Sequence, residues 1–260
     1  RGRLYFLPMK RLRMALAQIN TTVGDLDGNL ARCIEKAGHA EALGADLVVF
    51  PELTLTGYPP EDLLLRPGFL RRCREVLDAF ARSSGNICSV IGFAGCDTAV
   101  YNSAAVVSGG AVRSIYRKMF LPNYGVFDEK RYFSPGDKEG LFFLNDVGVG
   151  LTICEDIWVD GGPYKKLGRS LGADVIVNIS ASPFHAGKIR EREDLLRRRS
   201  IESGVPIAYV NLTGGQDELV FDGGSLVFDR EGTCILRARS FTEEMAVIDL
   251  EFESGSPPVP

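Results

Sequence analysis

The stretch VGVGLTICEDIW, residues 147–158, decides how the chain is interpreted, because an apolar run ends at a cysteine that two acids and a tryptophan follow. The run 147–154 predicts a strand buried on both faces, and therefore a sheet that is covered on both sides. Cys154 stands at the end of this strand, where α/β proteins place their sites. Flanking carboxylates hold a thiol protonated, so a catalytic Cys154 needs a base and a cation from elsewhere in the chain.

Strand-like and helix-like segments alternate on both sides of this stretch. Two closing hairpin-like strands end near Asp249, and Gly109-Gly110 marks an earlier hairpin. Mixed hairpin and helix connections argue against a purely parallel sheet, so we expect an α/β domain of two packed mixed sheets with helices outside. The remaining predicted strands are 12–20, 46–50, 87–95, 101–107, 111–118, 140–144, 173–180 and 206–212, and the predicted helices are 25–44, 67–83, 164–171 and 188–203.

Composition is ordinary for a soluble globular protein, with 45% hydrophobic and 25% charged residues in a chain of 260. The net charge of −4 gives no reason to expect nucleic-acid or anionic-membrane binding. No apolar run approaches the ~18 residues of a membrane span, so the cytoplasm is the default location. The arginine-rich segment KIREREDLLRRRS, 188–200, alternates with acids at helical spacing, and we interpret it as a solvated helix face.

The cysteines carry no metal-binding or disulfide pattern. Six are scattered without CxxC pairs, and only His39 and His185 could join them, so a zinc site is not expected. Reduced, mostly buried thiols are typical of an intracellular protein.

The two ends of the chain differ from the rest. Residues 1–8 lack the long apolar region and cleavage site of a signal peptide, and we interpret them as a leader or cloning remnant before Met9 or Met14. Residues 254–260, SGSPPVP, have the composition of a linker. The domain is therefore expected to span residues 9–253.

Three residues at strand ends could perform covalent chemistry together. Glu52 follows a predicted strand, Lys118 ends one, and Cys154 ends another. A carboxylate can take the thiol proton, an ammonium can stabilise an oxyanion, and the thiolate can attack an amide. Taken singly, each has a plain structural interpretation, as a loop carboxylate, a surface cation and a core thiol.

The sequences around these three residues change that interpretation. The segments FPELTLTGYPPEDLL (50–64), RKMFLPNYGVFDEKRYF (117–133) and VGLTICEDIW (149–158) resemble the three catalytic segments of the nitrilase, or carbon–nitrogen hydrolase, superfamily. With NISASPFHAGK (178–188), they are similar in detail to the glutaminase domain of bacterial glutamine-dependent NAD synthetases. The resemblance implies a four-layer αββα sandwich.

The resemblance also implies the roles of individual residues. Glu52 would be the general base, Lys118 the cation that stabilises the transition state, and Cys154 the nucleophile. Glu129 is the implied second active-site acid, with Asp128 as the alternative. The implied substrate contacts are Tyr58, Tyr124, Glu155, Trp158, Ser182 and Lys188. Glu155 and Ser182 would bind the α-amino group of L-glutamine, and Lys188 its α-carboxylate.

The same resemblance implies partners outside this domain. A C-terminal synthetase domain would use ATP and Mg to adenylate nicotinate adenine dinucleotide and accept the ammonia, whereas the glutaminase domain needs no cofactor and no metal. The SGGxDS-type phosphate loop of such a synthetase domain is not found in this sequence: SGGAVRS, 108–114, has Val112 at the aspartate position. No GxxxxGK or GxGxxG motif is present either. A homo-oligomer built from dimers is a further implication.

Three other functions remain open at this stage. A free-standing amidase, such as an ω-amidase or carbamoyl hydrolase, would use the same triad with a different pocket. A papain-like dyad of Cys154 and His185 would be a different mechanism, although it leaves Glu52 and Lys118 unexplained. A non-catalytic interaction module would keep these residues without using them.

Overall fold

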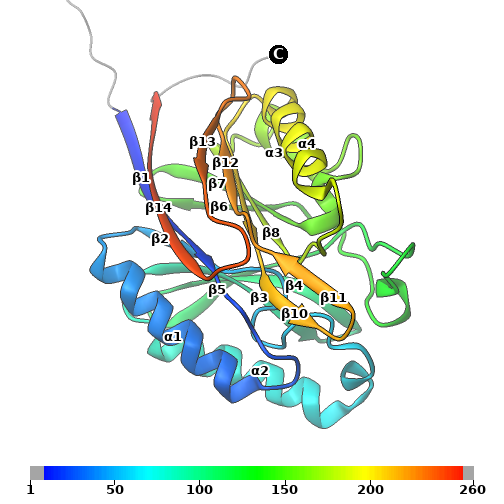
Figure 1. Cartoon of the computed structure of the whole chain (residues 1–260). Helices are drawn as coiled ribbons and strands as arrows, with labels where there is room; N and C mark the ends of the chain where they lie inside the picture. Colours follow the sequence, from blue (N-terminus) through cyan, green and yellow to red (C-terminus); the bar gives the residue numbers. More distant parts are fainter. Residues whose placement is uncertain (1–8, 254–260) are drawn as a thin grey trace, which may run out of the picture.

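The computed structural model describes residues 9–253. The leader predicted at 1–8 and the linker predicted at 254–260 lie outside the described residues. Within 9–253, two six-stranded mixed sheets pack face to face, and a two-stranded hairpin stands beside them (Figure 1). The predicted α/β fold with two mixed sheets is confirmed.

The first sheet has the strand order β14-β1-β2-β3-β4-β5. β1 pairs in parallel with β2, and β2 with β3, while the other neighbours are antiparallel. Its strands are β1 (Met9–Gln18), β2 (Leu47–Val49), β3 (Cys88–Cys96), β4 (Val100–Ser108), β5 (Ala111–Arg117) and β14 (Glu244–Glu253). β2 is short and buried, and the loop that contains Glu52 follows it directly.

The second sheet has the strand order β13-β12-β9-β8-β7-β6, with β7, β8 and β9 parallel at its centre. Its strands are β6 (Gly140–Leu144), β7 (Val147–Ile153), β8 (Val175–Ser180), β9 (Ile207–Asn211), β12 (Leu226–Phe228) and β13 (Cys234–Arg237). The separate hairpin is β10 (Thr213–Gln216) with β11 (Leu219–Asp222). All of β7 is buried, as its uninterrupted apolar run predicts.

Helices cover the outer face of each sheet, which gives the four-layer αββα sandwich. α1 (Leu26–Ala42) and α2 (Pro67–Ser83) pack on the first sheet, and α3 (Pro163–Arg169) and α4 (Lys188–Ser203) on the second (Figure 1). Short 3₁₀ turns are η1 (Glu61–Leu65), η2 (Glu129–Arg131) and η3 (Cys154–Ile157). The central core lies between the sheets, where Leu16 and Val49 meet Val149 and Val177.

The ends of the helices follow local chemistry. The Asp25 side chain accepts a hydrogen bond from the Gly28 N–H, so Asp25 is the cap of α1. Pro67 begins α2, where its fixed φ and missing N–H suit the first turn. Gly204, which has a φ of +74°, caps the C-terminal end of α4.

The C-terminal region differs from the expectation of two closing strands. The segment 213–253 forms five strands, and the last of them, β14, returns to the first sheet, where it pairs along the whole of β1. This pairing joins residues more than 200 positions apart, and periodicity within a local window contains no information about it.

The interpretation of 188–200 as a solvated face was wrong for two of its arginines. Arg192 and Arg199 are only 1% and 3% exposed, although the same helix is exposed elsewhere. Each lies on the buried stripe of α4 with Leu195 and Leu196, because residues three and four apart share one helix face.

Candidate active site

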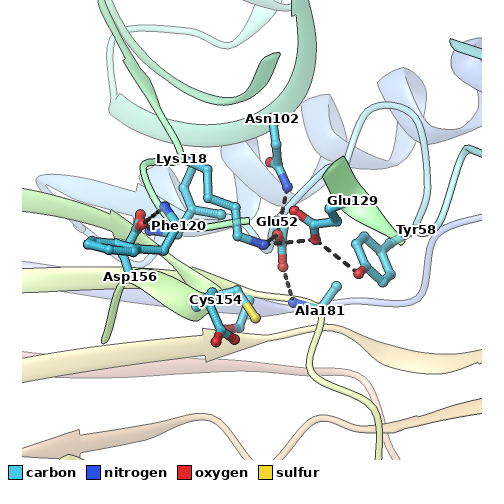
Figure 2. Close-up of polar contacts among 12 residues, drawn as sticks. Glu52, Tyr58, Asn102, Lys118, Phe120, Glu129, Cys154, Asp156 and Ala181 are labelled. Atoms are coloured by element: carbon cyan, nitrogen blue, oxygen red, sulfur yellow. Dashed lines mark hydrogen bonds and ion pairs between the residues drawn. The ribbon is translucent and has the colours of Figure 1, made fainter. Parts of the chain in front are cut away.

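Glu52, Lys118 and Cys154 meet between the two sheets, as their places at strand ends predict. The Lys118 Nζ lies 2.7 Å from Glu52 Oε1 and 2.8 Å from Glu129 Oε1, and the side chains of Lys118 and Glu52 are fully buried. The charges of Glu52 and Lys118 both act on the Cys154 thiol, and Figure 2 draws Cys154 beside Glu52, Lys118 and Ala181. The first sheet therefore supplies the base and the cation, and the second supplies the thiol.

The Glu52 carboxylate is fixed by neutral donors besides Lys118. Asn102 on β4 donates its Nδ2–H to Glu52 Oε1 at 2.7 Å, and the Ala181 N–H donates to Glu52 Oε2 at 2.9 Å (Figure 2). Gly92 on β3 lets the backbone around Glu52 lie close to that strand, because a Cβ at position 92 would lie 2.4 Å from the Pro51 oxygen and the Leu53 nitrogen. Both oxygens of Glu52 are thus oriented before any substrate binds.

Cys154 has an uncommon backbone conformation. Its φ is +41°, in the left-handed region that a residue other than glycine rarely adopts. Cys154 is also where β7 turns into η3, so the turn presents the thiol at the strand end. The side chain is 4% exposed.

The protonation states at the site follow from burial and from the neighbouring charges. Burial and the charge of Glu52 raise the pKa of the Cys154 thiol, so a free thiolate is disfavoured at neutral pH. Burial lowers the pKa of Lys118, but the charges of Glu129 and Glu52 outweigh it and hold the pKa well above its usual value. Lys118 is therefore a cation, and the thiol loses its proton only when a base takes it.

Asp156, one of the two acids that follow Cys154, has a structural role, because its carboxylate binds backbone groups. Oδ2 accepts from the Ile153 N–H at 2.9 Å and from the Tyr116 hydroxyl at 2.7 Å. Oδ1 accepts from the N–H groups of Met119 at 3.0 Å and Phe120 at 2.9 Å. One buried carboxylate thus joins the end of the nucleophile strand to the chain that follows Lys118.

The structure distinguishes between the two candidates for the second acid. Glu129 is buried against Lys118, whereas Asp128 points outward and lies 4.0 Å from Arg131. Tyr58 donates its hydroxyl to Glu129 Oε1 at 3.1 Å, and Glu129 Oε2 has no partner within residues 9–253. Burial, followed by the charge of Glu52, raises the pKa of Glu129.

The other predicted substrate contacts form two pairs near the site. The Tyr124 hydroxyl donates to Glu155, 3.1 and 2.9 Å from its two carboxylate oxygens. The Lys188 ammonium lies 3.8 Å from the centre of the Trp158 ring, and burial lowers the pKa of Lys188. Ser182 is buried directly after Ala181, and its N–H donates to Asn211 Oδ1 at 2.9 Å.

His185 does not pair with Cys154. Its side chain is 55% exposed, with Nε2 lying 3.7 Å from Glu191 and Nδ1 lying 3.0 Å from the Ala186 carbonyl oxygen. A papain-like dyad is therefore not formed.

Two cavities among the described residues differ in their place relative to the site. One of about 650 Å³ borders Tyr124, Glu155 and Lys130, and a larger one of about 860 Å³ lies away from the site, between the outer ends of β1 and β14 and the α3 end of the second sheet. Within residues 9–253, no three His, Cys, Asp or Glu side chains come together in a way that could hold a metal ion. No helix in the same range is long and apolar enough to cross a membrane.

Sequence reasoning missed the residues that support the triad. Asn102 contacts Glu52 from β4 and the Ala181 N–H contacts it from the loop after β8, while the sequence indicated Asp156 only as a charge near the thiol. No local pattern distinguishes Asn102 from any other strand residue. The position of Asp156, two residues after a candidate nucleophile, was the one signal available.

The comparison with protein families is decisive. A model described as carbon–nitrogen hydrolase matches residues 13–256. The chain belongs to the carbon–nitrogen hydrolase family. Curated relatives are more specific. The glutamine-dependent NAD(+) synthetase of Thermotoga maritima is 49% identical over 95% of the chain, and that of Xanthomonas campestris is 44% identical over 92% of it. The chain spans only 43% and 44% of those two proteins, less than half of each.

Solved structures agree with this assignment. A glutamine-dependent NAD+ synthetase from Acinetobacter baumannii superposes with a TM-score of 0.89 at 38% identity, covering 96% of this chain and 49% of its own. An amidase from Nesterenkonia sp. superposes with a TM-score of 0.82 at 26% identity, covering 96% of this chain and 94% of its own. The chain is thus a carbon–nitrogen hydrolase of the glutamine-dependent NAD synthetase type, and its four-layer fold is the one these structures share.

Proposed function

We propose that this chain hydrolyses the side-chain amide of L-glutamine and supplies the ammonia to an NAD synthetase activity carried by a C-terminal domain in the full-length protein. The observation that carries the proposal is the buried Lys118 ammonium between Glu52 and Glu129, with the Cys154 thiol beside it. Such a site holds a base and a cation in contact, with a nucleophile near both, before substrate arrives.

The first half of the reaction forms a thioester. Glu52 takes the Cys154 proton as the sulfur attacks the amide carbon, so the thiol never needs to exist as a stable thiolate. Lys118 and a backbone N–H after the nucleophile stabilise the oxyanion. The tetrahedral intermediate then breaks its C–N bond, Glu52 returns the proton to the leaving nitrogen, and ammonia departs.

The second half of the reaction releases glutamate. Water loses a proton to Glu52 and attacks the thioester carbon, and the C–S bond breaks. The sulfur recovers the proton, so glutamine and water give glutamate and ammonia with the enzyme unchanged. Glu129 contacts the same ammonium as Glu52, and its free Oε2 is available to the substrate amide.

The charged ends of glutamine fit the remaining predicted contacts. Glu155, held by Tyr124, supplies a carboxylate for the α-ammonium together with Ser182. Lys188, stacked on Trp158, supplies a cation for the α-carboxylate. A carboxylate next to the nucleophile therefore serves substrate recognition.

The proposal extends to the rest of the protein. The relatives are more than twice as long as this chain, which leaves room for an ATP- and Mg-dependent domain that amidates nicotinate adenine dinucleotide. The glutaminase part itself would need no cofactor. We also propose a cytoplasmic location and a homo-oligomer built from dimers.

The test is ammonia release from L-glutamine by the wild type and by Cys154→Ala. The variant is expected to lose turnover while its thermal unfolding is unchanged, and Cys96→Ala, an exposed thiol elsewhere, is the matched control. Mass mapping after treatment with a glutamine-like electrophile should place the adduct on Cys154. Substantial turnover by Cys154→Ala would reject the proposal.

A free-standing amidase is the second candidate, because the Nesterenkonia amidase matches this chain over nearly its own full length. In a related structure of that amidase, the acetamide moiety of fluoroacetamide is covalently added at the active site cysteine. Kinetics on glutamine, an ω-amide of a dicarboxylic acid and a carbamoyl amino acid would separate the two candidates. A kcat/KM highest for one of the latter two would favour the amidase.

A further inference from the structure

α4 carries a buried charge that the catalytic groups do not explain. Arg192 is 1% exposed and is the largest of the fully buried side chains in the described part of the chain. Its guanidinium donates from Nη1 to Asp222 Oδ2 at 3.0 Å and from Nη2 to Asp222 Oδ1 at 2.9 Å. Asp222, at the end of β11, is 0% exposed.

A buried ion pair of this kind is weak evidence for stability. Removing two charges from water has a large free-energy cost, and apolar residues of similar volume are often as stabilising. The pair does, however, fix the orientation of the two side chains relative to each other, because a bidentate Arg–carboxylate pair has one preferred geometry. The role of the pair therefore depends on which groups it holds in place.

The pair leads by short contacts to the loop after β8. Arg192 Nη1 also donates to the Gly223 carbonyl oxygen at 3.2 Å, and Asn211 Nδ2 donates to the same oxygen at 3.0 Å. Asn211 Oδ1 in turn accepts the Ser182 N–H at 2.9 Å. Gly223 has a φ of +62°, and a Cβ there would meet Gln18 at 2.4 Å, so this close turn requires glycine.

The loop that this network holds touches the catalytic machinery directly. The Ala181 N–H donates to Glu52 Oε2, and Ser182 is the next residue. Arg192 also lies four residues after Lys188 on the same face of α4, so anchoring Arg192 fixes that turn of the helix too. Glu52, Ser182 and Lys188 are thus all linked to one buried ion pair.

We propose that Arg192 is a positioning residue: through Asp222 and Asn211 it sets the Ala181–Ser182 loop, which orients the Glu52 carboxylate and the substrate contact Ser182. The inference rests on the proposed function, since it assumes that this site hydrolyses an amide. Arg192 acts through other groups and touches neither thiol nor substrate. Lysine cannot replace it, because an ammonium has no fork.

The experiment is a double-mutant cycle in the 260-residue chain with Arg192→Lys and Ser182→Ala, read as kcat and KM for glutamine hydrolysis. Arg192→Lys is expected to lower kcat and raise KM, with kcat/KM at least about ten-fold lower, since small misplacements cost this much. The double variant should lose less than the product of the single losses, because both changes act on one loop. Arg197→Lys, at an exposed ion pair on the same helix, is the matched control and should match the wild type.

Two results would overturn the inference. One is an Arg192→Lys variant whose kcat/KM stays within about two-fold of the wild type while only its melting temperature falls. The other is a double variant that loses the full product of the two single effects, which marks independent sites. If Arg192→Lys does not fold, Asn211→Ala breaks the same connection without leaving a buried charge, and the same criteria apply to it.

A separate measurement distinguishes this inference from the proposed function. If the wild type does not hydrolyse glutamine, the proposed function fails, and the rate of Cys154 alkylation by iodoacetamide becomes the readout for Arg192. Arg192→Lys should then react more slowly than the wild type and Arg197→Lys, because the base beside the thiol is misplaced. Equal rates in all three proteins would overturn the inference.

Discussion

Asp156 shows how one residue can connect two sheets at the point where their chemistry meets. Its two oxygens accept four hydrogen bonds, one from Tyr116 on β5, two from Met119 and Phe120 in the chain after β5, and one from the last residue of β7. Burial raises the pKa of Asp156 to about 6, but the hydrogen bonds that it accepts lower the pKa and limit the rise, so the carboxylate is ionised at neutral pH. The position of Cys154 relative to Lys118 is therefore set by a neighbour that takes no part in the reaction.

Asp156→Asn is expected to lower both stability and turnover. The amide oxygen can still accept from Met119 and Phe120, but the amide nitrogen then faces the Ile153 N–H, which loses its acceptor. An unpaired buried N–H costs about 1–3 kcal/mol. Thermal unfolding and kcat at pH 7.5 measure the two effects, and we expect kcat to fall by about ten-fold or more.

Tyr116→Phe is the control for this prediction. It removes one of the four donors and leaves the three backbone contacts of Asp156 intact, so its effect on kcat should be much smaller. An Asp156→Asn variant that is destabilised but turns over at the wild-type rate would show that Asp156 only supports the fold.

At the scale of the elements, the catalytic carboxylate depends on how closely β3 passes the loop after β2. The Phe50 N–H donates to the Val90 carbonyl oxygen and the Leu55 N–H to the Gly92 carbonyl oxygen, so the loop is tied to β3 on both sides of Glu52. Gly92 faces the loop backbone with no room for a side chain. Glycine is needed here for close approach.

Gly92→Ala is expected to displace Glu52 and reduce turnover. The added Cβ would lie 2.4 Å from both the Pro51 oxygen and the Leu53 nitrogen, and backbone on each side has to move. Overpacking of this kind costs about 1–3 kcal/mol, and a shift of the base toward or away from the thiol lowers kcat by roughly ten-fold or more. Steady-state kinetics and chemical unfolding are the measurements.

Gly38→Ala is the matched control, because a Cβ at that position of α1 meets nothing within 4 Å. Alanine in a helix interior is favoured over glycine by roughly 0.5–1 kcal/mol, so this variant should be at least as stable as the wild type and equally active. A Gly92→Ala variant that behaves in the same way would mean that the loop adapts without moving the base.

The sequence predicted the elements whose signals are local. α2 and α4 have the predicted bounds, with Pro67 at the first position of α2, and each triad residue was a candidate because it stands at or just after the end of a predicted strand. The burial of Arg192 and Arg199 could have been predicted, since both share the 3- and 4-residue spacing of Leu195 and Leu196. Their charge was given more weight than their position.

Contacts between distant segments could not be predicted in this way. Asn102 reaches Glu52 from β4, Ala181 reaches it from the other sheet, and β14 pairs with β1 across more than 200 residues. Nothing in the local pattern around these residues specifies their partners. Such contacts follow from the packing of the two sheets, which periodicity alone does not define.

For the whole molecule, the site reduces stability in a way that depends on pH. Burial, followed by the charge of Glu52, raises the pKa of Glu129 above its usual value of 4.5, so the folded protein holds that proton more tightly than the unfolded chain. The resulting contribution to stability is complete below pH 4.5 and is lost as the pH rises through the raised pKa. At neutral pH and above, the protein keeps two buried carboxylates around one ammonium at the expense of its free energy of unfolding.

Glu129→Gln isolates this effect, because glutamine has a similar shape and does not ionise. The free energy of unfolding of the variant minus that of the wild type should move in favour of the variant as the pH rises from 4.5 to 8.5, by on the order of 1 kcal/mol or more, since one pKa unit corresponds to about 1.4 kcal/mol. Denaturant unfolding of both proteins at several pH values measures the difference, and groups elsewhere titrate alike in the two proteins and cancel. The same variant should be nearly inactive on glutamine, because Lys118 and the substrate amide lose a carboxylate. A difference that stays constant with pH would mean that Glu129 does not hold its proton more tightly in the folded state, and that the site is not under the electrostatic strain inferred from its buried charges.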